Sequence, residues 1–125
     1  MDKPTNPVNW FEIAVVDLDR ATQFYEGVFG IALTEEGMGP LQMAWFPMAE
    51  GAPGAAGSLV KGEGYVPSTT GTNIYFSVEG IEGVLERVSA NGGRTLMPRT
   101  SIGEYGFIAH FADREGNRVG LHSMT

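Results

Sequence analysis

Few residues of this 125-residue chain can take part in acid–base chemistry near neutral pH, because the chain has two histidines and no cysteine. Without cysteine, a thiolate nucleophile, a disulfide and a cysteine-bound zinc ion are excluded. Glu12 lies in a run of alternating apolar and polar residues near the start of the chain, and His122 lies near its end. A carboxylate and an imidazole that face each other can act as a general base and its partner.

Three interpretations of Glu12 and His122 remain open. The two side chains can transfer protons or orient a polar ligand without a metal. They can also hold a divalent metal ion, although zinc and iron sites usually have three or four strong ligands. Finally, they can form a hydrogen-bonded pair that only fixes the register of two strands, as buried polar groups commonly do. For the second histidine, His110, we expect a structural or interface role, because a single histidine is weak evidence for a site.

An internal repeat indicates which elements position these residues. Residues 10–36 and 73–99 match without a gap at an offset of 63, mainly in the positions of their apolar side chains. Such self-similarity indicates two copies of one structural unit. Each copy starts with alternating apolar residues, as in residues 11–15, which predicts a strand with one buried face. By this alternation, Trp10 and Glu12 lie on the face opposite to the buried one.

A helix and three more strands complete each predicted copy. Apolar residues at helical spacing follow each first strand, and in the first copy Asp17 is the expected N-cap and Gly30 the expected left-handed end. The further strands are expected at residues 31–36, 41–48, 57–61, 94–100, 107–112 and 118–124. The predicted fold is therefore α+β, a single domain with unit one at about residues 8–62 and unit two at about residues 72–125. The linker at about residues 62–71 is a candidate mobile loop over a site.

The overall composition argues against nucleic acids and membranes as binding partners. A formal net charge of −7 repels phosphate backbones, so we expect no nucleic-acid partner. No apolar run approaches the roughly 20 residues that a membrane-spanning helix needs, so we expect no membrane partner. Residues 1–9 are polar and contain two prolines, which does not fit a signal peptide. These features favour a cytoplasmic location.

Both ends of the chain carry motifs of one known superfamily. The segment WFEIAVVDLDRATQFYEGVFG resembles the first strand and helix of the glyoxalase, bleomycin-resistance and extradiol-dioxygenase (vicinal oxygen chelate) superfamily. The matching residues there are Val15, Asp17, Arg20, Ala21, Phe24, Tyr25 and Gly30. The segment FADREGNRVGLHS resembles the last hairpin of the superfamily through Asp113, Arg114, Gly116, Asn117, Gly120 and Leu121. More narrowly, the chain resembles a bacterial subgroup that is related to lactoylglutathione lyase. The resemblance implies two βαβββ units that form a cupped, partly closed mixed sheet with helices outside, and a homodimer.

The resemblance also implies where a metal ion would bind. Metal-dependent members place histidine, glutamine or glutamate in the first and last strand of each unit. The corresponding positions here hold Trp10, Gly57, Asn73 and Gly120. None of these residues supplies the imidazole, carboxylate or thiolate that a divalent first-row metal prefers. We therefore expect no cofactor, and an atypical divalent metal site at Glu12 and His122 is the alternative.

Two classes of function follow from these expectations. The first is an enzyme, related to lyases, isomerases or dioxygenases, in which Glu12 is the base and His122 its partner in a metal-free proton transfer. An enzyme with atypical metal ligands is a variant of this class. The second is a non-catalytic module of the bleomycin-resistance type that sequesters a small apolar or aromatic molecule. The side chains that we expect to bind this ligand are Trp10, Trp45, Leu59, Asn73 and Tyr75.

Overall fold

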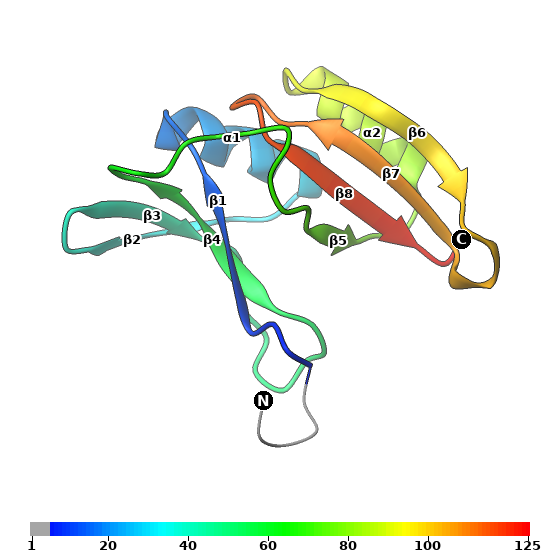
Figure 1. Cartoon of the computed structure of the whole chain (residues 1–125), viewed down its shortest axis with the longest axis horizontal. Helices are drawn as coiled ribbons and strands as arrows, with labels where there is room; N and C mark the ends of the chain where they lie inside the picture. The colour runs from blue at the N-terminus through cyan, green and yellow to red at the C-terminus, as the bar shows by residue number, and fades with distance from the viewer. Residues whose placement is uncertain (1–5) are drawn as a thin grey trace.

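The computed structural model describes residues 6–125, and its strands form two four-stranded sheets (Figure 1). The strand order is β1-β4-β3-β2 in the first sheet and β5-β8-β7-β6 in the second. The elements of unit one are β1 (Trp10–Ala14), α1 (Leu18–Phe29), β2 (Thr34–Met38), β3 (Leu41–Trp45) and β4 (Ala56–Lys61). The elements of unit two are β5 (Tyr75–Ser77), α2 (Ile81–Ala90), β6 (Arg94–Ser101), the 3₁₀ helix η1 (Gly103–Tyr105), β7 (Phe107–Ala112) and β8 (Arg118–Ser123). The predicted α+β fold of two βαβββ units is confirmed.

Each unit closes its sheet in the same way. The first strand pairs in parallel with the last strand, which is β1 with β4 and β5 with β8. The remaining pairs are antiparallel hairpin pairs. A parallel pair needs a long crossover, and α1 or α2 lies within that crossover in each unit. The first strand of each unit is consequently an edge strand, and both edge strands lie toward the middle of the molecule (Figure 1).

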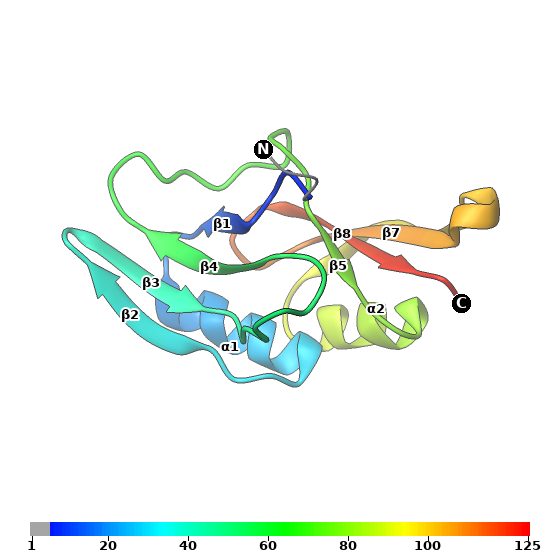
Figure 2. The same ribbon diagram turned by 90° about the horizontal axis from the view of Figure 1, so that it is seen from below.

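The two helices form where the sequence pattern predicts them. The Asp17 side chain accepts a hydrogen bond from the Arg20 backbone N–H at 3.0 Å, so Asp17 is the N-cap of α1 as expected. Gly30 ends α1 with φ of 65°, a left-handed conformation that glycine adopts without strain. Both helices cover the same side of the two sheets (Figure 2). No helix within residues 6–125 is long and apolar enough to cross a membrane.

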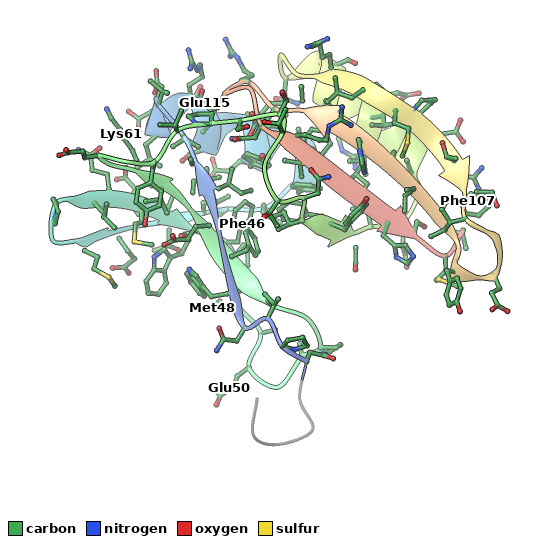
Figure 3. The ribbon with its side chains drawn as sticks, viewed as in Figure 1. Phe46, Met48, Glu50, Lys61, Phe107 and Glu115 are labelled. Carbon is green, nitrogen blue, oxygen red and sulfur yellow. The ribbon has the colours of Figure 1, made fainter. Side chains whose placement is uncertain are left out.

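One hydrophobic core joins the two units on the helix side of the sheets. Phe76 of β5 packs against Phe11 of β1 and against Phe46, with ring centroids 5.6 Å and 5.5 Å away. Figure 3 shows Phe46 near the centre of the molecule, between the two units. The helices are also tied together, because Arg87 of α2 donates from Nε to the Val28 carbonyl of α1 at 2.8 Å. The two sheets are therefore held side by side by a shared apolar layer.

The strand bounds of unit one differ most from the predicted ones. β2 begins at Thr34, three residues later than predicted, and Ile31 and Leu33 pack against the core from a segment outside the strand. β3 ends at Trp45 instead of residue 48. Pro47 comes two residues later, and proline has no N–H to donate to a strand partner. In unit two, β6, β7 and β8 end within one residue of their predicted bounds.

Candidate ligand site on the open face of the sheets

The sheet face that the helices leave uncovered is called the open face here. Strand pairing and the burial of alternate residues in the core determine which side chains lie on it. On the first sheet these include Trp10, Glu12, Trp45 and Ser58. On the second sheet they include Tyr75, His110, Arg118, Gly120 and His122. Most residues that the sequence marked as candidates therefore share one face, although they belong to two sheets.

Glu12 is covered in part by the linker between the units. Its Oε1 accepts a hydrogen bond from the Tyr65 hydroxyl at 3.1 Å, and this bond raises the pKa of Tyr65 above its usual value. The linker is also held at Ser68, whose backbone N–H donates to the Asn117 side chain at 3.0 Å. A cavity of about 230 Å³ lies there, and its lining includes Glu12, Ser68, Asn117 and Arg118. The predicted linker therefore does lie over part of the open face.

Tyr75, His110 and Arg118 form a hydrogen-bonded chain on the second sheet. His110 Nε2 lies 2.7 Å from the Tyr75 hydroxyl, and His110 Nδ1 lies 2.9 Å from Nη1 of Arg118. A guanidinium only donates, so Nδ1 must be the acceptor and the proton of the neutral ring must be on Nε2. Burial, and then the charge of Arg118, lower the pKa of His110 and favour this neutral form. The hydroxyl hydrogen of Tyr75 is then left to donate elsewhere on the open face.

The glycine at position 120 makes this chain possible. Tyr75 and Gly120 are direct partners in the parallel pair of β5 and β8. A Cβ atom at position 120 would clash with the Tyr75 ring, so the ring lies across Gly120. No other residue type at position 120 is compatible with this orientation of Tyr75. Aromatic surface thus fills the place where a side chain would otherwise project from β8.

Glu12 and His122 do not form a pair with each other in the described part of the chain. Glu12 is in the first sheet and His122 is in the second. Nε2 of His122 lies 2.7 Å from the Tyr105 carbonyl oxygen. A carbonyl only accepts, so Nε2 carries the proton, and within residues 6–125 Nδ1 of a neutral His122 has no hydrogen-bond partner and can accept. The two predicted catalytic residues therefore have separate partners, Tyr65 and Tyr105.

Strand pairing corrects one of the four predicted metal positions. Glu12 pairs with Ser58, and its repeat counterpart Tyr75 pairs with Gly120. Ser58, and not Gly57, is consequently the counterpart of Gly120. Gly57 faces the helix side, because a Cβ atom there would clash with Phe11. The offset of 63 holds for the first strand of each unit but is one residue shorter for the last strand.

Two other predicted ligand-binding residues lie apart from the rest. Leu59 is completely buried in the core, where it pairs with Ile13 and Ala44 on the helix side. Leu59 therefore does not line the open face, because strand alternation turns it away from its neighbour Ser58. Asn73 is exposed and precedes β5, which begins at Tyr75. It lines a cavity of about 430 Å³ together with Tyr75.

The first sheet carries an unusual combination of aromatic and polar groups. The rings of Trp10 and Trp45 meet edge to face with centroids 5.3 Å apart. Trp45 and Ser58 are direct partners across β3 and β4. Within the described residues, Nε1 of Trp45 and Oγ of Ser58 are buried without a hydrogen-bond partner. Trp10 also lines a cavity of about 880 Å³, and the loop between β3 and β4 contributes to its lining.

The motif residues of the last hairpin serve a buried contact between the units. The Tyr25 hydroxyl of α1 donates to Oδ2 of Asp113 at 2.7 Å. Oδ1 of Asp113 accepts from the backbone N–H groups of Glu115 and Asn117, each at 2.9 Å. Asn117 Nδ2 in turn donates to the Ala14 carbonyl of β1 at 2.8 Å. Burial, and then the charge of Asp113, raise the pKa of Tyr25 well above its usual value.

Glu115 adds a second contact between the same elements. Its carboxylate accepts from the backbone N–H groups of Val16 and Asp17 at 2.7 Å and 2.9 Å and from Nε of Arg20 at 2.7 Å. The Glu115 side chain is almost fully buried, whereas that of Arg20 is partly exposed. Figure 3 shows Glu115 beside the start of α1. The motif residues Asp113 and Asn117, together with Glu115 between them, fix the two units to each other and do not lie on the open face.

Comparison with known proteins agrees with this architecture. Residues 8–121 match the family model described as "Glyoxalase/Bleomycin resistance protein/Dioxygenase superfamily". The chain belongs to this superfamily. Among curated relatives, a Mycobacterium tuberculosis protein named "Putative glyoxylase CFP32" is 29% identical over 90% of this chain and 44% of its own length. The chain thus spans less than half of that relative. A glyoxylase-like domain-containing protein of Didymella fabae is 27% identical over 88% of each chain.

Solved structures of the superfamily have the same fold. TnmS3, an antibiotic-binding protein from a Streptomyces species, superposes with a TM-score of 0.73 at 20% identity and covers 98% of this chain and 99% of its own. A mutant of glyoxalase I from Zea mays gives a TM-score of 0.70 at 21% identity, with 94% of this chain and 46% of that chain covered. At these identities the likeness establishes the fold alone.

The residues at the superfamily's metal positions do not fit a metal ion. With the corrected register these positions hold Trp10, Ser58, Asn73 and Gly120. Their only donors are one hydroxyl and one amide, and first-row divalent metals prefer imidazole, carboxylate or thiolate. Within residues 6–125 no three histidine, aspartate or glutamate side chains gather closely enough to hold a metal ion.

Sequence reasoning did not find His110 and Arg118 as open-face residues. The alternation of His110 with the buried Ala109 and Phe111 was the available signal.

Proposed function

We propose that this protein binds a small, neutral aromatic molecule on its open face without a metal ion. The observation that carries this proposal is the aromatic surface at the superfamily's metal positions. Trp10 itself stands at one position, and the Tyr75 ring lies across Gly120 at another. Flat aromatic rings bind aromatic ligands through large apolar contact with edge-to-face geometry.

Charge favours a neutral ligand over an anionic one. The chain has a formal net charge of −7, and Glu12 lies on the open face beside Ser58. Both repel a carboxylate or a phosphate. The cavity beside Trp10, of about 880 Å³, falls within the range of small-molecule sites. The likeness in fold to the antibiotic-binding protein TnmS3 is consistent with this class of function.

Intrinsic tryptophan signals test the proposal directly. Trp10 and Trp45 are the only two tryptophans of the chain, and both lie on the open face. Titration with small aromatic compounds is expected to shift their fluorescence and their indole NMR signals. Trp10→Leu is expected to weaken binding about tenfold or more, because an aromatic contact worth ~1–3 kcal/mol is lost. Tyr105→Leu removes an exposed aromatic ring from η1 and serves as the matched control. Equal affinities of the two variants would refute the proposed site.

A second candidate function is metal-free proton transfer in which Glu12 is the base and His122, from the other sheet, acts on the substrate independently of Glu12. The observation in its favour is that Nδ1 of neutral His122 has no partner among the described residues, because the Tyr105 carbonyl holds the proton on Nε2. Once a turned-over substrate is found, Glu12→Gln is expected to lower kcat by about 100-fold or more. Unchanged turnover would eliminate Glu12 as the base.

We also propose that the protein is a homodimer, as the resemblance to the superfamily implies. Light scattering coupled to size-exclusion chromatography is expected to give twice the chain mass of 13.4 kDa. A single-chain mass at micromolar concentration would contradict the proposed dimer.

A further inference from the structure

Ser58 lies at the centre of a three-strand row on the open face of the first sheet. Glu12 of β1 is its partner on one side, and Trp45 of β3 is its partner on the other. Direct cross-strand partners have Cβ atoms about 4.5–5.5 Å apart, so the three side chains are immediate neighbours. Ser58 is completely buried. Its Oγ and the Trp45 Nε1 lack hydrogen-bond partners within the described residues.

In the equivalent row of unit two, each polar side chain has a hydrogen-bond partner. Strand pairing makes Tyr75, Gly120 and His110 the counterparts of Glu12, Ser58 and Trp45. There the Tyr75 hydroxyl and His110 bond to each other at 2.7 Å, and Arg118 satisfies the second ring nitrogen. Buried polar atoms in proteins are nearly always paired. The unpaired atoms of the first unit therefore point to a partner from outside the described residues.

The chemistry of the two atoms defines that partner. The indole Nε1–H is a donor only, whereas the serine hydroxyl both donates and accepts. One hydroxyl oxygen can accept from Trp45 and donate its own hydrogen to Ser58. A carboxylate could accept from both atoms, but Glu12 beside Ser58 would repel it.

We propose that Trp45 Nε1 and Ser58 Oγ form a polar subsite for the hydroxyl group of a phenolic ligand. The inference rests on the proposed function and specifies the ligand class of that site. Trp10 is the residue that must make room, because its ring abuts Trp45 and lines the neighbouring cavity. It stands at the first residue of β1 and is partly exposed, so its side chain can turn toward the cavity. The aromatic body of the ligand then packs against both tryptophans.

Three probes of the same shape test the subsite, namely p-cresol, toluene and 4-methylbenzoate. Calorimetric titration of the full chain is expected to show p-cresol binding about tenfold more tightly than toluene and 4-methylbenzoate more weakly than both. The Trp45 indole proton, assigned with Trp10→Phe, is expected to shift downfield with p-cresol but not with toluene. Ser58→Ala is expected to weaken p-cresol about three- to tenfold and to leave toluene unchanged. Ser77→Ala, the same change on the open face of the second sheet, is the matched control.

The outcomes separate this inference from the function on which it rests. Equal affinities for p-cresol and toluene, unaffected by Ser58→Ala, would overturn the polar subsite and leave aromatic binding intact. If no probe perturbs either tryptophan, the proposed function fails and the subsite fails with it. The ¹H–¹⁵N spectrum of Ser58→Ala shows whether the variant is folded. We expect it to be folded, since the substitution removes a hydroxyl without a partner.

Discussion

Replacing Tyr25 by phenylalanine removes one hydroxyl from the buried contact that joins the two units. Tyr25 is fully buried, and its hydroxyl donates to Asp113 at 2.7 Å. Without it, Oδ2 of Asp113 keeps only the longer bond from Asn117 Nδ2, at 3.1 Å. A buried hydrogen bond to a charged group contributes about 1.5–3 kcal/mol. Because one bond to the same oxygen remains, we expect a loss of about 2 kcal/mol in the free energy of unfolding.

Chemical denaturation and thermal melting measure this loss. For a domain of this size, about 2 kcal/mol corresponds to a fall in Tm of roughly 8 °C. Tyr65→Phe is the matched control, because Tyr65 also donates to a carboxylate but this hydrogen bond is exposed to solvent. We expect no measurable change in its stability. If Tyr25→Phe were as stable as Tyr65→Phe, the contact between the units would not have the role assigned to it.

Two further predictions concern the second sheet. Gly120→Ala is expected to lower stability by about 1–3 kcal/mol, because the added Cβ displaces the Tyr75 ring. By contrast, an added Cβ at Gly83 in α2 would meet only Nη1 of Arg87, at an ordinary contact distance of 3.7 Å. Gly83→Ala is therefore expected to raise stability by about 0.5–1 kcal/mol, and denaturant melts that rank the two variants the other way would contradict this packing. The lowered pKa of His110 predicts that its stabilising effect is fully present above its ordinary value of 6.5 and is lost as the pH falls through the lower folded value. An NMR titration of His110 is expected to give a midpoint below 6.5, and a midpoint above that value would disprove the neutral chain with Tyr75.

The sequence predicted the fold because two independent patterns agreed. Alternating apolar residues located the strands, and capping residues such as Asp17 and Gly30 bounded the first helix. The strand ends could not be predicted as well. Apolar residues at alternate positions, such as Ile31 and Leu33, occur both in a strand and in a loop that packs on the core. Only the tertiary core distinguishes the two cases.

The site was harder to predict because it depends on register and on long-range contacts. The offset of 63 comes from the first strand, the helix and the second strand of each unit. These residues carry no information on the last strand, where the offset is one residue shorter. A shift of one residue moves a side chain to the other face, which is why Ser58 replaced Gly57 on the open face. The bond between Tyr75 and His110 joins residues 35 apart and depends on a missing Cβ at Gly120. No local pattern encodes that combination.

The residues that identify the superfamily are not the residues that we expect to bind a ligand. Asp113 and Asn117 carry part of the resemblance to the superfamily, yet together with Glu115 they hold α1 and β1 against the last hairpin. They are needed for the architecture whatever the open face binds. The residues that distinguish this protein, such as Trp10 and Ser58, stand at positions that correspond to the metal ligands of metal-dependent members.

The affinity for p-cresol with and without divalent metal tests the central claim most directly. The dissociation constant is measured by calorimetry on protein dialysed against EDTA and again with one equivalent of Zn²⁺, Ni²⁺ or Mn²⁺. Because Trp10, Ser58, Asn73 and Gly120 offer no adequate metal ligands, we predict the same constant within about twofold in every condition. Stoichiometric metal binding that creates or strengthens p-cresol binding by tenfold or more would contradict a metal-free aromatic site.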